Sequence, residues 1–163
     1  MSRAFSAAAD VPADVPTAWR TLTGPSWPQA LAAALHDGSE LRSAEATADG
    51  GVVLVVSRRL PDGVPGFIQR FLPKDGRVTQ TDAWGPVVDG VARGTWEVSF
   101  PGSPGEIRGE MTLAPAAGRS TWSVTGTVSI QVPLVGGRIE GYLAPLAAKL
   151  VARQAEVLRE QVG

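Results

Sequence analysis

Side chains suited to acid–base chemistry are few in this sequence. His36 is the only imidazole and Tyr142 the only tyrosine. His36 precedes Asp37-Gly38 at the end of a short helical pattern, where a cation complements the helix dipole, so we expect it to cap that helix or lie on the surface. We expect Tyr142 to pack at the edge of the core; in the alternative, its hydroxyl meets a ligand.

Asp82 is a carboxylate for which the sequence leaves two environments open. Gln80 and Asp82 share a strand face with Val78 and Trp84. If that face points inward, burial raises the pKa of Asp82 and makes it a candidate for proton transfer. A shift of the strand by one residue would instead place it in solvent. Because aspartates are rarely buried without a partner, we expect Asp82 to be solvated.

Other kinds of reactive site lack the residues that they require. There is no cysteine, so there is no disulfide and no thiolate metal site, and a single histidine is too few for an ordinary zinc site. No Gly-x-Ser-x-Gly stretch marks a nucleophilic serine, and Gly118, Gly136 and Gly137 lack a phosphate-binding spacing. We expect no catalytic residue, metal or cofactor, and we favour a protein that is not an enzyme.

Length and charge exclude further classes. The 163 residues suit one domain, which we place at 1–163. Lys and Arg number 15 and Asp and Glu 16, so the net charge of −1 gives no long-range attraction to nucleic acid. The first residues contain no apolar run like that of a signal peptide, and no stretch is long enough to span a membrane. We expect a cytoplasmic protein without an integral membrane segment, either monomeric or weakly dimeric.

The longest helical pattern runs from Leu134 to Gln161. Its apolar residues recur at steps of three and four and form one stripe, made of Ile139, Leu143, Leu146, Leu150 and Val157. Such a helix needs a surface on which to bury that stripe. Pro145 removes the hydrogen bond to the carbonyl of Gly141, which predicts a kink and space beneath the helix.

Most of the remaining chain alternates apolar and polar residues, as half-buried antiparallel strands do. The expected strands are 2–10, 41–47, 52–60, 77–84, 92–100, 106–113 and 121–131. Two short helices, with Asp14 and Ser26 as N-caps, follow the first strand, and Gly38 is expected to end the second helix in a left-handed conformation. The order predicts an α+β fold in which a curved antiparallel sheet of about seven strands wraps around the C-terminal helix.

Two inward-facing glycines predict a special feature of this sheet. If the turn at 114–119 pairs Leu113 with Trp122, then Gly109 lies opposite Gly126. Paired inward glycines mark a bend or a close backbone approach. We expect the bend, and the alternative is that the glycines widen a cavity.

Aromatic residues gather on the expected concave side. Trp84, Trp96, Phe100 and Trp122 fall on inward faces, and Phe67 and Phe71 lie in a short helical segment above them. Such sets usually form the core, but they also line apolar ligand pockets. The candidate pocket residues are Phe67, Phe71, Trp84, Trp96, Met111, Trp122, Tyr142, Leu143, Leu146 and Leu150.

Basic residues concentrate around the segment Phe67–Leu72. They are Arg58, Arg59, Arg70, Lys74 and Arg77. We expect a solvated face. In the alternative, they meet an anionic head group or an acidic lipid surface at the mouth of a pocket.

Three stretches carry a resemblance to a known family: Pro65-Gly-Phe-Ile-Gln-Arg-Phe-Leu-Pro73, Trp84-Gly-Pro86 and Val132-Pro-Leu-Val-Gly-Gly-Arg-Ile-Glu140. With the order of elements, they resemble the actinobacterial domain of unknown function 2505, within the START-like (SRPBCC) superfamily of helix-grip proteins. That superfamily includes polyketide cyclases and the birch-pollen-allergen proteins. The resemblance covers essentially the whole chain. It implies a deep apolar cavity between the sheet and the C-terminal helix and a small hydrophobic ligand, and it carries over no catalytic residues.

These observations favour a non-enzymatic binding or carrier protein for a small apolar or amphipathic, lipid-like molecule. One alternative is an enzyme of the cyclase or dehydratase kind, in which Asp82 or Tyr142 handles a proton. Another is a protein-interaction module that uses the outer sheet face or the segment Phe67–Phe71 as an apolar patch.

Overall fold

The computed structural model describes residues 2–60 and 62–163, in which seven strands and four helices follow one another in the predicted order. One of these four helices, Gly66–Gln69, is the short helical segment predicted at Phe67 and Phe71. The elements are β1 (Arg3–Val11), α1 (Val15–Thr23), α2 (Trp27–Leu35), β2 (Glu40–Ala46), β3 (Val52–Arg59), α3 (Gly66–Gln69), β4 (Arg77–Trp84), β5 (Ala92–Ser99), β6 (Gly105–Ala116), β7 (Arg119–Ile130) and α4 (Gly136–Val162).

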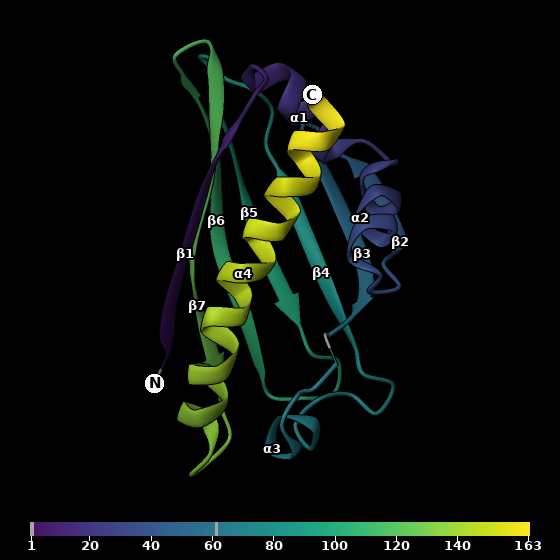
Figure 1. Cartoon of the computed structure of the whole chain (residues 1–163), viewed down its shortest axis with the longest axis vertical. Helices are drawn as coiled ribbons and strands as arrows, with labels where there is room; N and C mark the ends of the chain where they lie inside the picture. Colours follow the sequence, from purple (N-terminus) through teal and green to yellow (C-terminus); the bar gives the residue numbers. More distant parts are fainter. Residues whose placement is uncertain (1, 61) are drawn as a thin grey trace.

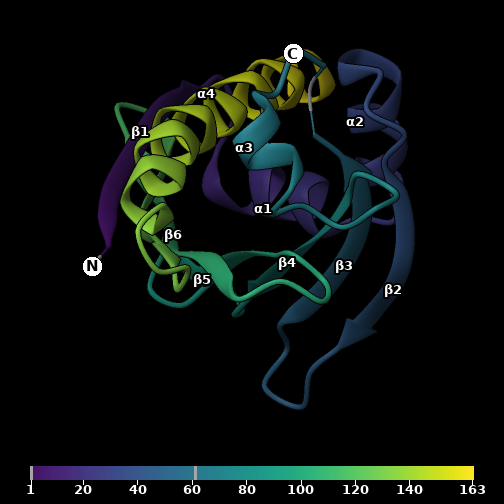
Figure 2. The ribbon, with the colours of Figure 1, turned by 90° about the horizontal axis from the view of Figure 1, so that it is seen from below.

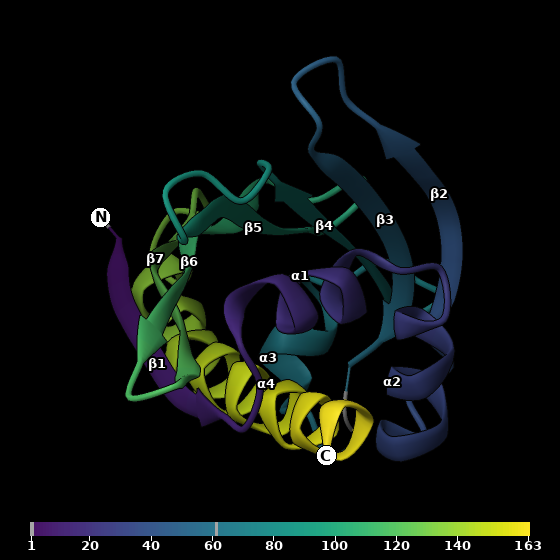
Figure 3. The ribbon, with the colours of Figure 1, turned by 90° about the horizontal axis from the view of Figure 1, so that it is seen from above.

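The strands form one antiparallel sheet in the order β1-β7-β6-β5-β4-β3-β2. The chain runs from β2 to β7 through neighbouring strands, while β1 lies at the far edge and pairs with β7. Helix α4 crosses the concave face of the sheet from the end of β7 towards α1 (Figure 1). Seen from either end, the sheet is an arc that α4 closes (Figures 2 and 3). The predicted α+β fold, a curved sheet wrapped on a long C-terminal helix, is confirmed.

The two short helices lie beside the C-terminal half of α4 (Figure 3). Asp14 caps α1, since its Oδ1 accepts a hydrogen bond from the Thr17 N–H at 2.9 Å. Ser26 is the N-cap residue of α2, but its side chain makes no capping hydrogen bond. Gly38 is left-handed as predicted, with a φ of 65°, but it does not end α2, whose left-handed C-cap is His36, with a φ of 53°. The helix ends earlier because the next residue is already tied to β3, where the Arg59 N–H donates to the Asp37 carbonyl at 2.9 Å.

The predicted register of β6 and β7 is confirmed, with Leu113 opposite Trp122 and Gly109 opposite Gly126. A Cβ on Gly126 would lie 2.1 Å from the carbonyl oxygen of Arg108, so the two strands approach as only glycine allows. The Phe5 ring of β1 lies 3.5 Å from the position of a Cβ on Gly109. The glycines therefore mark a close approach that Phe5 covers, not a widened cavity.

The core lies between the concave face of the sheet and α4. Its largest side chains include Trp84, Trp96, Phe100 and Trp122, each at most 2% exposed. From α4, the core receives Ile139, Leu143 and Val157, among others. Helix α4 continues through Pro145, which is exposed. None of the helices in the described residues is long and apolar enough to cross a membrane.

Two residues of the stretch Val132–Glu140, which carries part of the family resemblance, hold the connection between β7 and α4 in place. The Glu140 carboxylate is buried and accepts a hydrogen bond from the Ile130 N–H at 2.9 Å. A Cβ on Gly136 would lie 2.5 Å from the Ile130 carbonyl oxygen. The hydrogen bond of Glu140 and the close approach of Gly136 to Ile130 fix the direction in which α4 leaves the sheet. This stretch therefore has a structural role.

Candidate functional site

A pocket of about 580 Å³ opens between the end of α2, the end of β3 and the middle of α4. Its size falls in the range of small-molecule sites, about 300–1,000 Å³. Four leucines give it an apolar lining that packs on the core: Leu35, Leu60, Leu146 and Leu150. Its polar lining consists of His36, Asp37, Arg58, Arg59, Asp62, Lys149 and Arg153.

A second hollow, of about 520 Å³, is a weaker candidate. Its lining consists of Arg42, Ser57, Pro73, Lys74, Asp75, Arg77, Thr79 and Pro101. It is more open than the first pocket, and prolines supply its only large apolar surface within the part of the chain that the structure describes. Because ligand pockets are mainly apolar with a few polar anchors, the leucine-lined pocket is the better site.

Arg58 joins the pocket to the interior of the protein. Its position follows from the alternation of β3, in which Leu54, Val56 and Arg58 point to the same buried side. The guanidinium Nη2 lies 2.7 Å from Asp37 Oδ2, and Nη1 donates to Gln80 Oε1 at 2.8 Å. Burial lowers the pKa of Arg58, against the attraction of Asp37, and the group stays charged. Arg58 is therefore a buried cation whose charge is balanced at the pocket wall.

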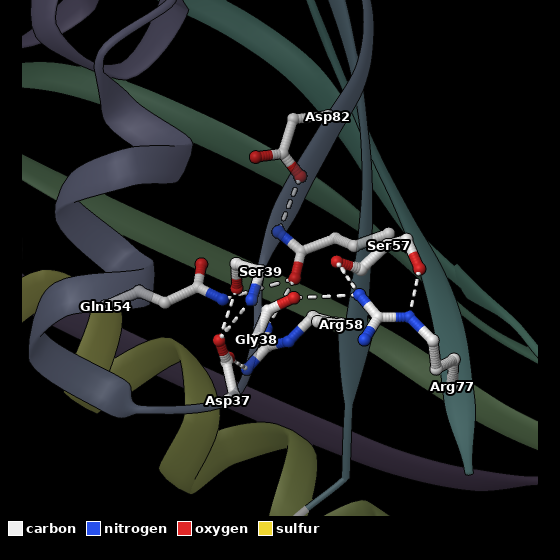
Figure 4. Close-up of polar contacts among 9 residues, drawn as sticks. Asp37, Gly38, Ser39, Ser57, Arg58, Arg77, Asp82 and Gln154 are labelled. Carbon is white, nitrogen blue, oxygen red and sulfur yellow. Dashed lines mark hydrogen bonds and ion pairs between the residues drawn. The ribbon is translucent and has the colours of Figure 1, made fainter. Parts of the chain in front are cut away.

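From Gln80 the polar chain continues to Asp82 and to Gln154, both of which are labelled in Figure 4. Gln80 Nε2 donates to Asp82 Oδ1 at 2.9 Å, and Gln80 Oε1 also accepts from Gln154 Nε2 of α4 at 3.2 Å. Asp82 lies beside Trp96, its partner in the register of β4 and β5. A connected line of polar side chains thus leads from the pocket to the indole-rich core.

The prediction that Asp82 is solvated was wrong, because its side chain is only 5% exposed. Burial raises the pKa of Asp82 to about 6, against the opposing hydrogen bond from Gln80 and the attraction of Arg58. The carboxylate is tolerated in the core because a cation and an amide lie close by. Asp82 does not itself line the pocket; Gln80 and Arg58 connect it to the lining.

Arg77 fixes the loop between α2 and β2 against β3 (Figure 4). Its Nη2 donates to the Gly38 carbonyl at 2.7 Å, and its Nε donates to Ser57 Oγ at 2.8 Å. Asp37 Oδ1 accepts from the Ser39 N–H at 3.0 Å. These contacts hold Asp37 in place beside Arg58, so the loop forms a stable wall of the pocket.

The structure separates the predicted pocket residues into two groups. Leu146 and Leu150 line the leucine-lined pocket. The others lie in the core or at its edge, and six of them are buried: Phe71, Trp84, Trp96, Met111, Trp122 and Leu143. Phe67 and Tyr142 are partly buried and pack against the core.

The predicted basic face has three different environments. Arg58 is buried, Arg77 is partly buried in hydrogen bonds, and Arg59, Arg70 and Lys74 are exposed. In the segment Phe67–Phe71, Ile68 and Phe71 point into the core, and the Arg138 guanidinium lies 4.4 Å from the centre of the Phe67 ring. This segment offers little free apolar surface, which weakens the idea of a protein-interaction patch there.

Several buried polar atoms have no hydrogen-bond partner among the described residues. They are the indole nitrogens of Trp27, Trp84, Trp96 and Trp122, together with Gln154 Oε1, for example. Trp19 differs, since its indole donates to the Gly85 carbonyl at 2.9 Å. A buried donor or acceptor without a partner is costly, so these atoms lower the stability of the fold.

Sequence reasoning missed Asp37 and Gln154 as members of this site. A signal was available for Gln154, because it lies four residues after the stripe residue Leu150 on the same helix. No comparable signal existed for Asp37, whose role depends on a loop folding back onto β3. Arg58 was predicted as part of a basic face that is solvated or, in the alternative, meets an anionic head group, although the alternation of its strand places it inward.

Comparison with solved structures shows that the fold is the START-like helix-grip fold. The structure superposes on a START superfamily protein from Mycobacterium smegmatis with a TM-score of 0.55 and 13% identity, covering 98% of this chain and 96% of that one. It superposes on human STARD10 with a TM-score of 0.58 and 11% identity, covering 95% of this chain and 62% of that one. At such identities the likeness establishes the fold.

The family follows from the sequence match. The chain belongs to the family described as protein of unknown function (DUF2505), which it matches over residues 6–162. A relative is the uncharacterized protein Rv0481c of Mycobacterium tuberculosis, 26% identical over 159 residues that cover 93% of this chain and 91% of the relative. The resemblance predicted from the three sequence stretches is confirmed.

Proposed function

We propose that the protein binds a small apolar or amphipathic molecule in the leucine-lined pocket and acts as a binding or carrier module. The observation that carries this proposal is the pocket of about 580 Å³ whose apolar lining continues into the core. Burial of apolar ligand surface against Leu35, Leu60, Leu146 and Leu150 provides the driving force, at about 25 cal/mol per Å² removed from water.

The polar interior supports a ligand that is not purely hydrocarbon. The line from Arg58 through Gln80 to Asp82 begins at the pocket wall, which Arg58 lines together with His36 and Asp37. The pocket therefore combines an apolar lining with a few polar groups that orient a ligand, as binding sites commonly do.

Titration with Nile red, a neutral apolar dye, tests this proposal through the dye's fluorescence. We expect binding to the wild type, and a loss of affinity of about tenfold or more in Leu146→Trp and Leu150→Trp, since the indole fills the space that the ligand needs. Leu41→Trp is the matched control, because Leu41 is exposed on β2, and it should keep wild-type affinity. A wild type that binds neither the dye nor a co-purifying molecule in native mass spectrometry would contradict the proposal.

The burial of Asp82 favours one second candidate, a cyclase- or dehydratase-type reaction in the same region. Its raised pKa of about 6 suits a group that takes up and releases a proton near neutral pH. If a ligand that binds is also converted, Asp82→Asn should abolish product formation, followed by mass spectrometry, while the affinity for the ligand is kept. Conversion at an unchanged rate in Asp82→Asn would remove this residue from any mechanism.

A further inference from the structure

Three basic side chains at the rim of the leucine-lined pocket have no acidic partner. Arg59 at the end of β3 and Lys149 and Arg153 on α4 are exposed, and none of them forms an ion pair within the described part of the chain. The acidic lining consists of Asp37 and Asp62. Asp37 is already neutralised by Arg58 at 2.7 Å, so the rim has an excess of positive charge.

The positions of these charges place them close together. Lys149 and Arg153 are four residues apart on α4 and therefore project from the same face of the helix, where like charges destabilise it. Burial is the main cause that lowers the pKa of Arg58, and the charge of Arg153 lowers this pKa further, so Arg153 also repels the buried guanidinium. An anion bound at this rim would relieve both repulsions, whereas a neutral or cationic group would not.

Arg58 does not serve as the anion's main partner. Its Nη1 and Nη2 atoms are engaged by Gln80 and Asp37, and its side chain is almost fully buried. It supplies a fixed positive wall behind the rim, while the exposed side chains of Arg59, Lys149 and Arg153 are free to approach a ligand. The leucines lie directly beside this rim, in the same pocket.

We propose that the ligand is an amphiphile with one anionic head, a carboxylate or a phosphate, which lies between the end of β3 and α4. Its apolar part contacts Leu60, Leu146 and Leu150 deeper in the pocket. This inference rests on the proposed function and specifies the chemical class of the ligand. Both heads share the property that the rim recognises, a compact negative charge that accepts hydrogen bonds.

Isothermal titration with four single-chain amphiphiles below their micelle concentrations tests the inference. The probes are decanoic acid, monodecyl phosphate, 1-decanol and decyltrimethylammonium, which share one apolar chain and differ in the head. We expect at least one anionic probe to bind about tenfold more tightly than 1-decanol, as two partly exposed charge contacts allow. Added salt should lower the affinity for the anionic probe and leave the affinity for 1-decanol unchanged, because salt screens exposed charges. The tighter anion identifies the head as a carboxylate or a phosphate.

The double variant Lys149→Gln/Arg153→Gln assigns the effect to the rim. It should reduce the affinity for the anionic probe about tenfold, to that of 1-decanol, and leave the affinity for 1-decanol unchanged. Arg93→Gln/Arg119→Gln is the matched control, since it removes the same charge from exposed positions outside the pocket. It should behave as the wild type.

The outcomes separate the two proposals. Equal affinity for decanoate, decyl phosphate and 1-decanol, or an unchanged anion affinity in Lys149→Gln/Arg153→Gln, would overturn the anionic head and leave the proposed function standing. Tighter binding of decyltrimethylammonium than of the anionic probes would also overturn the anionic head and leave the proposed function standing. Failure of all four probes to bind the wild type would overturn the anionic head, and the proposed function falls with it if Nile red and native mass spectrometry also show no bound molecule. Arg59→Gln tests the part of the rim that β3 contributes. It should lower the affinity for the anionic probe and leave the affinity for 1-decanol unchanged.

Discussion

Asp82 is the residue whose chemistry depends most on its surroundings. Its carboxylate lies beside Trp96, accepts one hydrogen bond from Gln80, and is attracted by the charge of Arg58, which donates a hydrogen bond to the same Gln80. Desolvation outweighs these favourable contacts and raises the pKa of Asp82 from 3.8 to about 6. The folded state therefore holds the Asp82 proton more tightly than the unfolded chain does.

The stability of the protein should consequently depend on pH through Asp82. Between pH 3.8 and about 6 the folded state binds more protons than the unfolded state, so the contribution of Asp82 to the free energy of unfolding falls as the pH rises. The loss is of the order of 3 kcal/mol for a shift of this size. We expect Asp82→Asn to remove this loss, so that the variant gains stability relative to the wild type as the pH rises from 4 to 7. Urea denaturation across that range measures it, and parallel stability profiles would contradict it.

Substitution by alanine should cost much more stability at Trp96 than at Leu146. Trp96 is fully buried, and its ring contacts Phe5 edge-on with the ring centres 5.8 Å apart. Trp96→Ala should cost about 3–5 kcal/mol through the cavity that it leaves. Leu146→Ala should cost less than about 2 kcal/mol, because Leu146 is partly exposed at the pocket. Equal urea midpoints for the two variants would contradict this assignment.

At the scale of elements, the start of α4 determines how the helix lies on the sheet. Glu140 is 2% exposed and accepts the hydrogen bond of the last residue of β7, Ile130. This contact closes the connection between β7 and α4, and Arg159 ties the other end of the helix to β1 by donating to the Asp10 carbonyl at 2.9 Å. The helix is thus fixed to both strands that it covers at one edge of the sheet.

We expect Glu140→Ala to cost about 1–3 kcal/mol, because it leaves the Ile130 N–H buried without an acceptor. Glu140→Gln keeps an oxygen at the same position and should cost clearly less. Thermal and urea unfolding of the two variants give the comparison. If both cost the same, the hydrogen bond is not what stabilises this connection.

At the scale of the whole molecule, stability should vary across the sheet. Strands β6 and β7 pair along their full length, from Gly105 opposite Ile130 to Ala116 opposite Arg119, and both lie inside the sheet. Strand β2 is an edge strand, and all its residues except Ser43 are exposed. Its local opening therefore exposes little apolar surface.

Amide hydrogen exchange should reveal this difference. We expect the β2 amides that bond to β3 to exchange of the order of 100-fold faster than the central β6 and β7 amides, since each 1.4 kcal/mol of opening free energy is a factor of ten. Mass spectrometry or NMR under native conditions measures both sets in one experiment. Equal protection in β2 and β7 would show that the sheet opens only as a unit.

The order of the elements, the buried faces of β5, β6 and β7 and the register of β6 and β7 could be predicted from the sequence. These features are local, because apolar alternation fixes the face of each strand and the turn at 114–119 fixes which residues are paired. The same is true of α4, whose stripe of apolar residues predicts both its existence and its buried side. The resemblance to the family also depended on local stretches.

The pocket and its charges were decided only by the tertiary structure. Gln154 and Gln80 are 74 positions apart, and Arg58 meets Asp37 only because the loop after α2 folds back onto β3. The environment of Asp82 depends on these partners, which is why the prediction of a solvated carboxylate was wrong. Alternation places a side chain inside or outside, but its chemistry is set by which distant side chains share that space, and packing of the whole chain determines them.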